Sequence, residues 1–148
     1  MNISIMKIKD YDAVYSLWIN TPGMGLNTLD DSKEGIESFL KRNPSTCFVA
    51  KDKTRVIGVI LSGHDGRRGY IYHTAVAIEE RGKGIGIRLV EKAIEALKNE
   101  GIHKVGLVVF EKNETGNKFW ESIGFEERKD LIYRSKVITL RNMERIDT

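Results

Sequence analysis

The alternation of apolar and polar positions along the 148 residues predicts strands interleaved with amphipathic helices. Short, nearly continuous apolar runs are typical of strands, and they cover residues 3–8, 48–51, 56–61, 70–78, 105–110 and 132–140, with another strand starting over 124–127. Apolar positions recur at helical spacing over residues 10–18, 31–43, 85–98 and 114–122. The pattern predicts one α/β domain over residues 1–148, with a mixed, largely antiparallel central sheet flanked by helices.

Capping and turn residues set the boundaries of these elements. Asp10 can cap the first helix, Asp31 or Ser32 starts the second, and the second must end before Pro44. Gly101 is a natural terminator for the third helix. The run over residues 105–110 is apolar without alternation, which predicts a central strand covered on both faces.

Composition narrows the class of protein. The 24 basic and 21 acidic residues leave a net charge of only +3. That charge is too small to produce the positive electrostatic field expected of a nucleic-acid binder. The single cysteine, Cys47, lies in an apolar run and suits a buried small hydrophobe in a reducing compartment. No stretch approaches the ~20 apolar residues that span a bilayer, and the start does not resemble a leader peptide. We expect a cytoplasmic protein with neither nucleic acid nor membrane as a partner.

The most informative segment is Arg81-Gly82-Lys83-Gly84-Ile85-Gly86, which lies between a predicted strand and a predicted helix. Glycines let the main chain approach a ligand closely, and the first amides of a helix have no partner within it. The helix dipole and the side chains of Arg81 and Lys83 add positive charge at the same place. The segment therefore predicts a phosphate-binding turn.

Spacing limits which phosphate ligand this turn binds. It does not fit G-x-G-x-x-G, because Ile87 or Leu89 falls at the last glycine position, and it lacks the Lys-Ser or Lys-Thr of a Walker loop. The remaining pattern, R-x-x-G-x-G, resembles the pyrophosphate-binding motif of the GNAT superfamily of N-acetyltransferases. Residues 113–125, from Asn113 to Phe125, resemble the family's second signature, N-x-x-A-x-x-[LF]-Y-x-x-x-G-F. The resemblance covers roughly residues 46–134.

The resemblance implies an enzyme that moves acetyl from acetyl-coenzyme A, its cosubstrate, to a primary amine of a small molecule or protein, by direct attack in a ternary complex. It also implies that the strand over residues 74–78 separates from its neighbour and exposes main-chain groups to the pantetheine arm. The residues that would bind the cofactor are Val76, Ile78, Arg81, Gly82, Lys83, Gly84, Ile85, Gly86, Asn113 and Trp120.

The catalytic groups depart from the family pattern. Trp120 stands where the family has a tyrosine acid, and an indole donates a hydrogen bond but cannot transfer a proton. A glutamate that some members carry is replaced by Val108. Replacement acids are Tyr133 and Tyr72, each of which is equally an ordinary strand aromatic. The candidate bases are three residues on or just beyond central strands: Glu79, His73 and Glu111.

Several alternatives remain open. The loop over residues 23–31 is expected to shape the acceptor site, where Asp30 and Asp31 either attract a cationic amine or cap the second helix. The histidines have no metal-ligand spacing, so we expect no metal site. Because Trp120 stands at the acid position, a second function class stays open: a non-catalytic module that senses coenzyme A. A structural protein that binds no cofactor is a third class. Homodimers are common among the family, and a homodimer is left open here.

Overall fold

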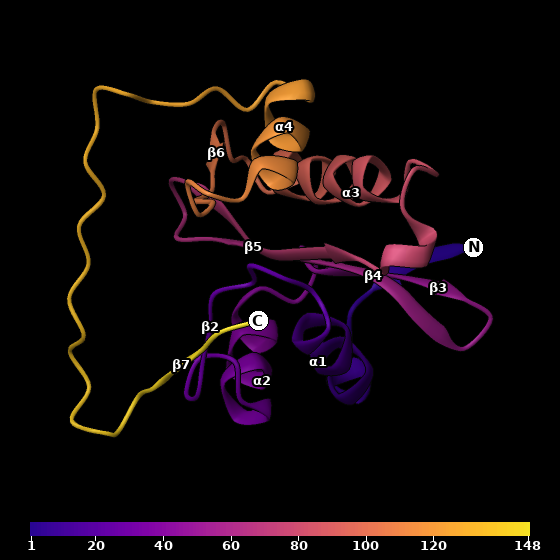
Figure 1. Cartoon of the computed structure of the whole chain (residues 1–148), viewed down its shortest axis with the longest axis horizontal. Helices are drawn as coiled ribbons and strands as arrows, with labels where there is room; N and C mark the ends of the chain where they lie inside the picture. The colour runs from indigo at the N-terminus through magenta and orange to yellow at the C-terminus, as the bar shows by residue number, and fades with distance from the viewer.

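A five-stranded sheet between two layers of helices forms the body of the computed structural model, which describes residues 1–148 (Figure 1). The strands lie in the order β1-β3-β4-β5-β6, and their bounds are Asn2–Ile5, Phe48–Asp52, Arg55–His64, Gly69–Val76 and Val105–Gly106. The first three pairings are antiparallel and the β5–β6 pairing is parallel. The mixed, largely antiparallel sheet predicted from the sequence is confirmed.

Two helices cover each face of the sheet (Figure 1). On one face lie α1 (Tyr11–Ile19) and α2 (Lys33–Arg42), and on the other lie α3 (Ile85–Asn99) and α4 (Glu114–Ser122). Two short turns of 3-10 helix, η1 (Ile8–Asp10) and η2 (Ile78–Glu80), precede α1 and α3. Each face has its own apolar core. Trp18 is the largest fully buried side chain on the α1 face, and Leu89 is fully buried on the α3 face.

The four helices begin and end close to where local chemistry predicts. Ser32 caps α2, with its Oγ accepting from the Gly35 amide at 3.0 Å, and α2 ends two residues before Pro44. Gly101 follows α3 at φ +82°, the left-handed conformation that glycine adopts without strain. Asp10 precedes α1 but does not cap it through its side chain; its carboxylate accepts from the Lys7 amide instead. No helix is both long enough and apolar enough to span a bilayer.

The predicted central strand over residues 105–110 is wrong. Only Val105–Gly106 pairs, with Gly69 and Tyr70, so β6 is a two-residue edge strand. Val108 and Phe110 are 62% and 45% exposed, which a strand covered on both faces would not allow. An apolar run predicts that a segment favours a strand, but the ladder also needs a neighbour on each side, and no segment pairs with the outer edge of β6.

The two strands predicted over residues 124–127 and 132–140 are also wrong. Residues 126–144, which we call the strap, run as a long extended segment at the left of the molecule (Figure 1). The strap begins after Phe125, whose amide donates to the Trp120 carbonyl, and ends where β7 (Arg145–Ile146) pairs with β2 (Leu26–Asn27). Both ends are thereby fixed to the domain, and the middle of the strap has no ladder partner.

Candidate active site

A β-bulge in β5 marks the centre of the sheet. Ala75 pairs with Val59 and Tyr72 with Leu61, so His73 and Thr74 together oppose a single residue of β4. His73 has φ +41°, which is uncommon for a residue with a Cβ atom and costs of order 1 kcal/mol or more. Bulges re-aim side chains and bend strands, and they recur next to active sites. The bulge therefore singles out His73 as a residue whose position has been set at some energetic cost.

Beyond their first two pairs, β5 and the segment after β6 are not joined by a ladder. Pairing stops at Tyr70 and Gly106, and residues 107–110 form no ladder with residues 71–76. The Ala77 amide donates to the Ile57 carbonyl of β4, so the main-chain groups of Val76 face the opposite way, into the opening. Arg81 Nε donates to the Val76 carbonyl at 3.2 Å. Ile78 lies just past the strand, in η2, and is 61% exposed.

The glycine-rich segment forms a turn at the start of α3, as predicted. Gly82 and Gly84 have φ +80° and +79°, so both positions need a residue that tolerates the left-handed conformation. Gly84 is the N-cap of α3 and no side chain caps the helix, which leaves the first amides, from Ile85 onward, without a partner. A Cβ at Gly86 would lie 3.2 Å from Phe119 Cζ, so this glycine lets α4 approach the same turn.

Ion pairs hold the charged side chains around this turn. Lys83 Nζ lies 2.6 Å from Glu80 Oε2, and the Arg55 guanidinium pairs with Glu80 at 2.8 Å and Glu79 at 2.9 Å. A hydrogen bond from its own main chain and the Arg55 guanidinium lower the pKa of Glu79. Glu79 is also solvent-exposed, with 62% of its side chain accessible. Of the candidate bases, Glu79 is therefore the one held as a stable carboxylate at the surface.

His73 forms a hydrogen-bonded pair with Asp31, 42 positions away in the sequence. Its Nε2 lies 2.7 Å from Asp31 Oδ1, and the two side chains are 14% and 4% exposed. Asp31 Oδ2 accepts from the Asn27 amide at 2.8 Å. Because a carboxylate only accepts, Nε2 carries the proton, and Nδ1 of the neutral ring is left as the acceptor. From the sequence we expected Asp31 near an amine or at a helix cap, but not as the partner of His73.

Trp18 completes the surroundings of this pair on the α1 and α2 face of the sheet. Its Nε1 donates to the His73 carbonyl at 3.0 Å, and its ring meets the imidazole edge-on at 5.1 Å. The backbone of the bulge is thus held by a fully buried side chain. The imidazole is fixed by one carboxylate and one indole, an arrangement that positions a histidine for proton transfer.

The candidate acids lie on two different segments, β5 and the strap. Tyr72 is on β5, next to His73, and is 43% exposed; partial burial raises its pKa, with a smaller contribution from Tyr133. Tyr133 itself lies in the strap and is 71% exposed. Glu111, the third candidate base, lies in the exposed turn before α4. The structure therefore brings His73 and Tyr72 together on one strand and leaves Tyr133 on a separate segment.

Asn113 and Trp120 position α4 beside the opening. Asn113 Oδ1 accepts from the Gly116 amide at 2.9 Å and so caps α4, and its amide nitrogen lies 3.3 Å from where a Cβ of Gly23 would be. Trp120 packs edge-on against Phe119 and Phe125, at 5.0 and 5.1 Å. The loop between α1 and α2 thus reaches the turn that precedes α4, across the open end of the sheet.

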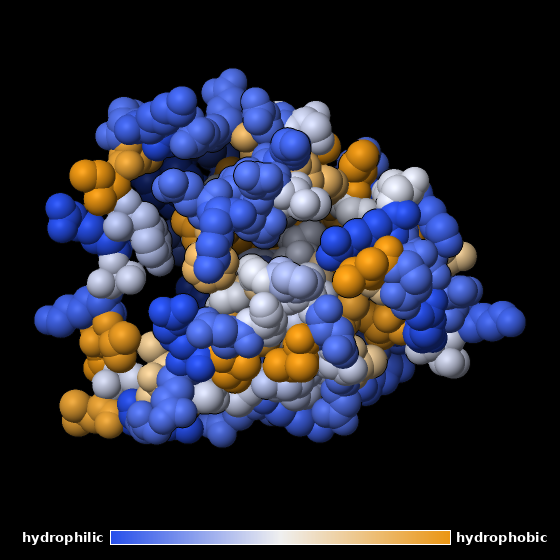
Figure 2. Space-filling model, viewed as in Figure 1, coloured by the Kyte–Doolittle hydropathy of each residue, from blue (hydrophilic) through white to orange (hydrophobic).

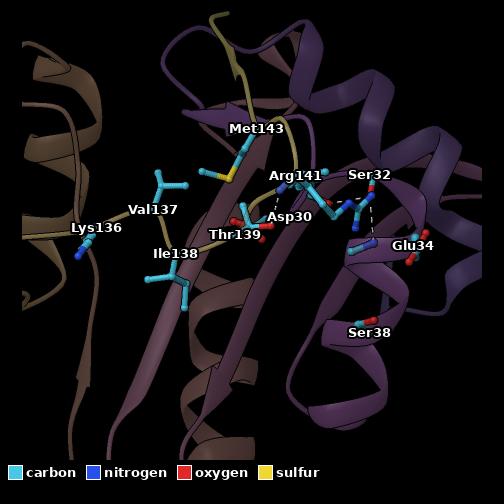
Figure 3. A pocket seen from close by; sticks show the side chains of 12 residues that line it. Asp30, Ser32, Glu34, Ser38, Lys136, Val137, Ile138, Thr139, Arg141 and Met143 are labelled. Carbon is cyan, nitrogen blue, oxygen red and sulfur yellow. Dashed lines mark hydrogen bonds between the residues drawn. The ribbon is translucent and has the colours of Figure 1, made fainter.

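A cavity of about 400 Å³ lies between the start of α2 and the strap (Figure 3). Asp30, Ser32 and Glu34 line one side of it, from the start of α2 and the loop before it. The opposite side comes from residues 136–143 of the strap, and it carries Lys136 and Arg141. The predicted acceptor loop therefore contributes to a real cavity, and its lining is of mixed charge.

The parted strand edge and the uncapped start of α3 are the two features that the sequence resemblance led us to expect of an acyltransferase. A model of the acetyltransferase (GNAT) family matches residues 11–125, and the chain belongs to that family. It is an acyltransferase, and acetyl-coenzyme A is its cosubstrate.

Relatives and solved structures agree with this assignment. A protein of Photorhabdus laumondii named as an acetyltransferase is 30% identical over 144 residues, which cover 93% of this chain and 96% of the relative. The fold is similar to Ard1 of Thermoplasma volcanium, with a TM-score of 0.74, 19% identity, and coverage of 83% of this chain and 80% of that one. It is also similar to the PaiA N-acetyltransferase of Thermoplasma acidophilum in complex with coenzyme A, with a TM-score of 0.71, 20% identity, and coverage of 85% and 91%.

Proposed function

We propose that this protein transfers the acetyl group of acetyl-coenzyme A to a primary amine by direct attack in a ternary complex. The observation that carries the proposal is the opening beside β5, which has the glycine turn at one end and the His73–Asp31 pair on its α1 and α2 face. A phosphate-binding end and a proton-accepting group are thus joined by one strand edge. Such an edge can align an extended thioester between them.

The cofactor would bind through main-chain groups. The amides around Gly82, Gly84, Ile85 and Gly86 would hold the diphosphate, and the pantetheine arm would pair with the free edge at Val76 and approach Ile78. Two cations would change partners on binding. Arg81 leaves the Val76 carbonyl and Lys83 leaves Glu80, and both turn to phosphate oxygens. Asn113 and Trp120 would form the side of the opening that α4 provides.

His73 is the base that the geometry favours. The amine nitrogen attacks the thioester carbon, and Nδ1 of His73 takes the proton that the amine loses, directly or through one water. Asp31 stabilises the imidazolium that forms, since Nε2–H already donates to its carboxylate. The C–S bond then breaks, and the coenzyme A thiolate leaves with its electron pair and takes a proton from solvent or from Tyr72. Trp120 contacts the cofactor and transfers no proton.

The acceptor would enter from the α1 and α2 face, past the loop over residues 23–31. Asp30 and Glu34 would attract a cationic amine, while Lys136 and Arg141 across the cavity favour an acceptor that also carries an anionic group. A cytoplasmic location belongs to the same proposal and is supported by the reduced, buried Cys47.

The test has a binding arm and a turnover arm. Calorimetry measures coenzyme A binding to the wild type, to Gly84→Ala and to Gly84→Glu. Both variants carry a similar left-handed strain, of about 1–2 kcal/mol, but only the glutamate places an anion where the diphosphate sits. We expect Gly84→Ala to bind and Gly84→Glu to lose binding. Thiol release from acetyl-coenzyme A is then followed across monoamines, diamines, amino acids and peptide N-termini.

The same two arms separate the enzyme from the competing class. Trp120 in the place of the family's acid is the feature that favours a module that senses coenzyme A. Tight binding with no thiol release across the panel would favour the sensing module. Equal binding by Gly84→Ala and Gly84→Glu would contradict the site itself.

A further inference from the structure

The hydroxyl of Thr74 is the one buried side-chain polar group of the chain that has no hydrogen-bond partner. Its Oγ1 is out of contact with solvent, although the residue as a whole is only partly buried. Leaving a buried hydroxyl unpaired costs free energy, and native structures contain few such groups. An unpaired hydroxyl in β5, next to the candidate base, therefore indicates a partner that a ligand supplies.

Thr74 and His73 lie on opposite faces of the sheet. His73 contacts Trp18 of α1, and Ala75 belongs to the apolar core of the same face. Side chains alternate along a strand, so Thr74, which lies between these two residues, faces α3 and α4 together with Val76. The bulge thus presents an imidazole on one face of β5 and a hydroxyl on the other.

This hydroxyl lies where the proposed function places the thioester. The pantetheine arm follows the free strand edge from the glycine turn past Val76, and Thr74 lies about 7 Å further along β5 at the usual rise per strand residue. The amine attacks from the α1 and α2 face, where His73 takes its proton. The diphosphate binds at the start of α3, so the sulfur, which is bonded to the attacked carbon, lies toward the α3 and α4 face.

Open space lies beside this part of β5. Pairing with β6 stops at Tyr70, and residues 107–110 form no ladder with β5. Figure 2 shows a hollow between the strap and the body of the molecule. A ligand in the opening can therefore reach the strand edge at Thr74 without breaking a strand pairing.

We infer that the Thr74 hydroxyl donates a hydrogen bond to the sulfur of coenzyme A, a role that rests on the cofactor placement in the proposed function. When the C–S bond breaks, its electron pair passes to the sulfur, and the hydrogen bond stabilises the negative charge that forms there. Thr74 keeps its own proton, because an alkyl hydroxyl is a much weaker acid than a thiol, and the thiolate is protonated afterwards. A rotation about χ1 exchanges the hydroxyl and the methyl group between staggered positions and brings Oγ1 toward the opening.

The first experiment compares two ligands by calorimetry. Desulfo-coenzyme A carries a hydrogen in place of the thiol, so it reports every contact of the cofactor except those of the sulfur. At about pH 9, above the usual pKa of a thiol, we expect Thr74→Val to bind coenzyme A about tenfold more weakly than the wild type does. The same variant should bind desulfo-coenzyme A like the wild type. Thr74→Ser keeps the hydroxyl and should keep the preference for coenzyme A.

The outcomes of this comparison are distinct. An equal loss of affinity for both ligands in Thr74→Val, or no loss for either, overturns the contact with sulfur and leaves the cofactor site intact. A wild type that binds neither ligand contradicts the cofactor site itself, so the proposed function and this contact would both be wrong.

The second experiment titrates the thiol of bound coenzyme A by the ultraviolet absorbance of its thiolate. The hydrogen bond stabilises the ionised form, so the pKa of the bound thiol should lie below that of the free ligand. Thr74→Val should raise the pKa of the bound thiol by about one unit, which equals the tenfold loss of affinity. Cys47 is the only thiol of the chain, and burial raises its pKa to about 12, so it adds little thiolate signal. A bound pKa that Thr74→Val leaves unchanged overturns the proposal.

Stability without a ligand separates this role from a structural one. Thr74→Val removes an unpaired hydroxyl, so its urea midpoint should equal or exceed that of the wild type. Thr46→Val is the matched control, because Thr46 Oγ1 is buried and donates to the Ser62 carbonyl at 2.6 Å. This control should lose stability and keep the preference for coenzyme A over desulfo-coenzyme A. A Thr74→Val chain that is less stable than the wild type without a ligand would show that the hydroxyl has its partner within the fold, and would overturn the proposal.

Discussion

Replacing Asp31 with asparagine removes the charge that faces His73 and leaves almost the same shape. The carboxylate accepts two hydrogen bonds, from His73 Nε2 at 2.7 Å and from the Asn27 amide at 2.8 Å, at only 3% residue exposure. An asparagine has one acceptor oxygen, so its NH2 group must face one of these donors. Losing one hydrogen bond to a charged group costs about 1.5–3 kcal/mol.

That cost has a thermal and a catalytic consequence. At about 2–4 °C of melting temperature per kcal/mol for a chain of this length, we expect the Asp31→Asn variant to melt roughly 3–12 °C lower. A positioned base contributes typically 10²–10⁴ in rate, so loss of its orienting carboxylate should lower kcat/KM by about 10²-fold, or about 2.7 kcal/mol. Coenzyme A affinity should not change, because neither side chain faces the glycine turn.

The assay is thiol release by the wild type, by each single variant of Asp31→Asn and His73→Gln, and by the double variant. If Asp31 acts through His73, the second substitution adds little to the first, so the two effects on kcat/KM do not multiply. Asp12→Asn, an exposed carboxylate in the first turn of α1, is the control for loss of one negative charge. Multiplying effects, or a kcat/KM that Asp31→Asn leaves at the wild-type level, would refute the pair as the catalytic base.

Three further predictions test other parts of the molecule. Burial raises the pKa of the Cys47 thiol to about 12, so its protonated form is favoured by folding. The free energy of unfolding of the wild type relative to Cys47→Ala should therefore be constant below about pH 9 and fall above it, by at most about 1.4 kcal/mol per pH unit, in urea titrations at stepped pH. Gly35→Ala should lower the urea midpoint strongly, because its Cβ would clash with the Leu29 and Asp30 carbonyl oxygens before α2; Gly106→Ala, with open space around it and no left-handed backbone, is the steric control. Trp120→Phe should leave the pH profile of kcat unchanged, and a profile that loses one limb would show that position 120 takes part in proton transfer.

The parts of the fold that the sequence predicts correctly are those that local chemistry decides. Ser32 caps α2 with an amide three residues away, and Gly84 supplies a conformation that its own lack of a side chain permits. The hairpin between β3 and β4 likewise depends on neighbouring residues. None of these needs information from a distant part of the chain, so hydrophobic spacing and turn residues are sufficient.

The parts that the sequence predicts wrongly depend on a distant partner. Residues 107–110 and 132–140 have the composition of strands, but a strand exists only where another strand completes its ladder. In the single chain the strap is fixed at both ends and does not reach the edge of β6. The apolar residues of both segments, Val108 and Ile138 among them, are therefore exposed although their spacing is typical of strands.

The candidate base, His73, could not be singled out from the sequence either, because its surroundings depend on distant residues. His73 has no distinguishing local sequence, and its neighbours Tyr72 and Thr74 would suit any strand. Two long-range events make it special: the extra residue that β5 inserts opposite β4, and the approach of Asp31 from the loop before α2. Because the bulge turns His73 toward the α1 and α2 face while the strand edge at Val76 faces the opening, a single irregularity in β5 can place a base and a thioester on the same strand, three residues apart. In the proposed mechanism the free energy stored in the φ of His73 is a cost of catalysis, so a relaxed β5 without the bulge should gain stability and lose turnover.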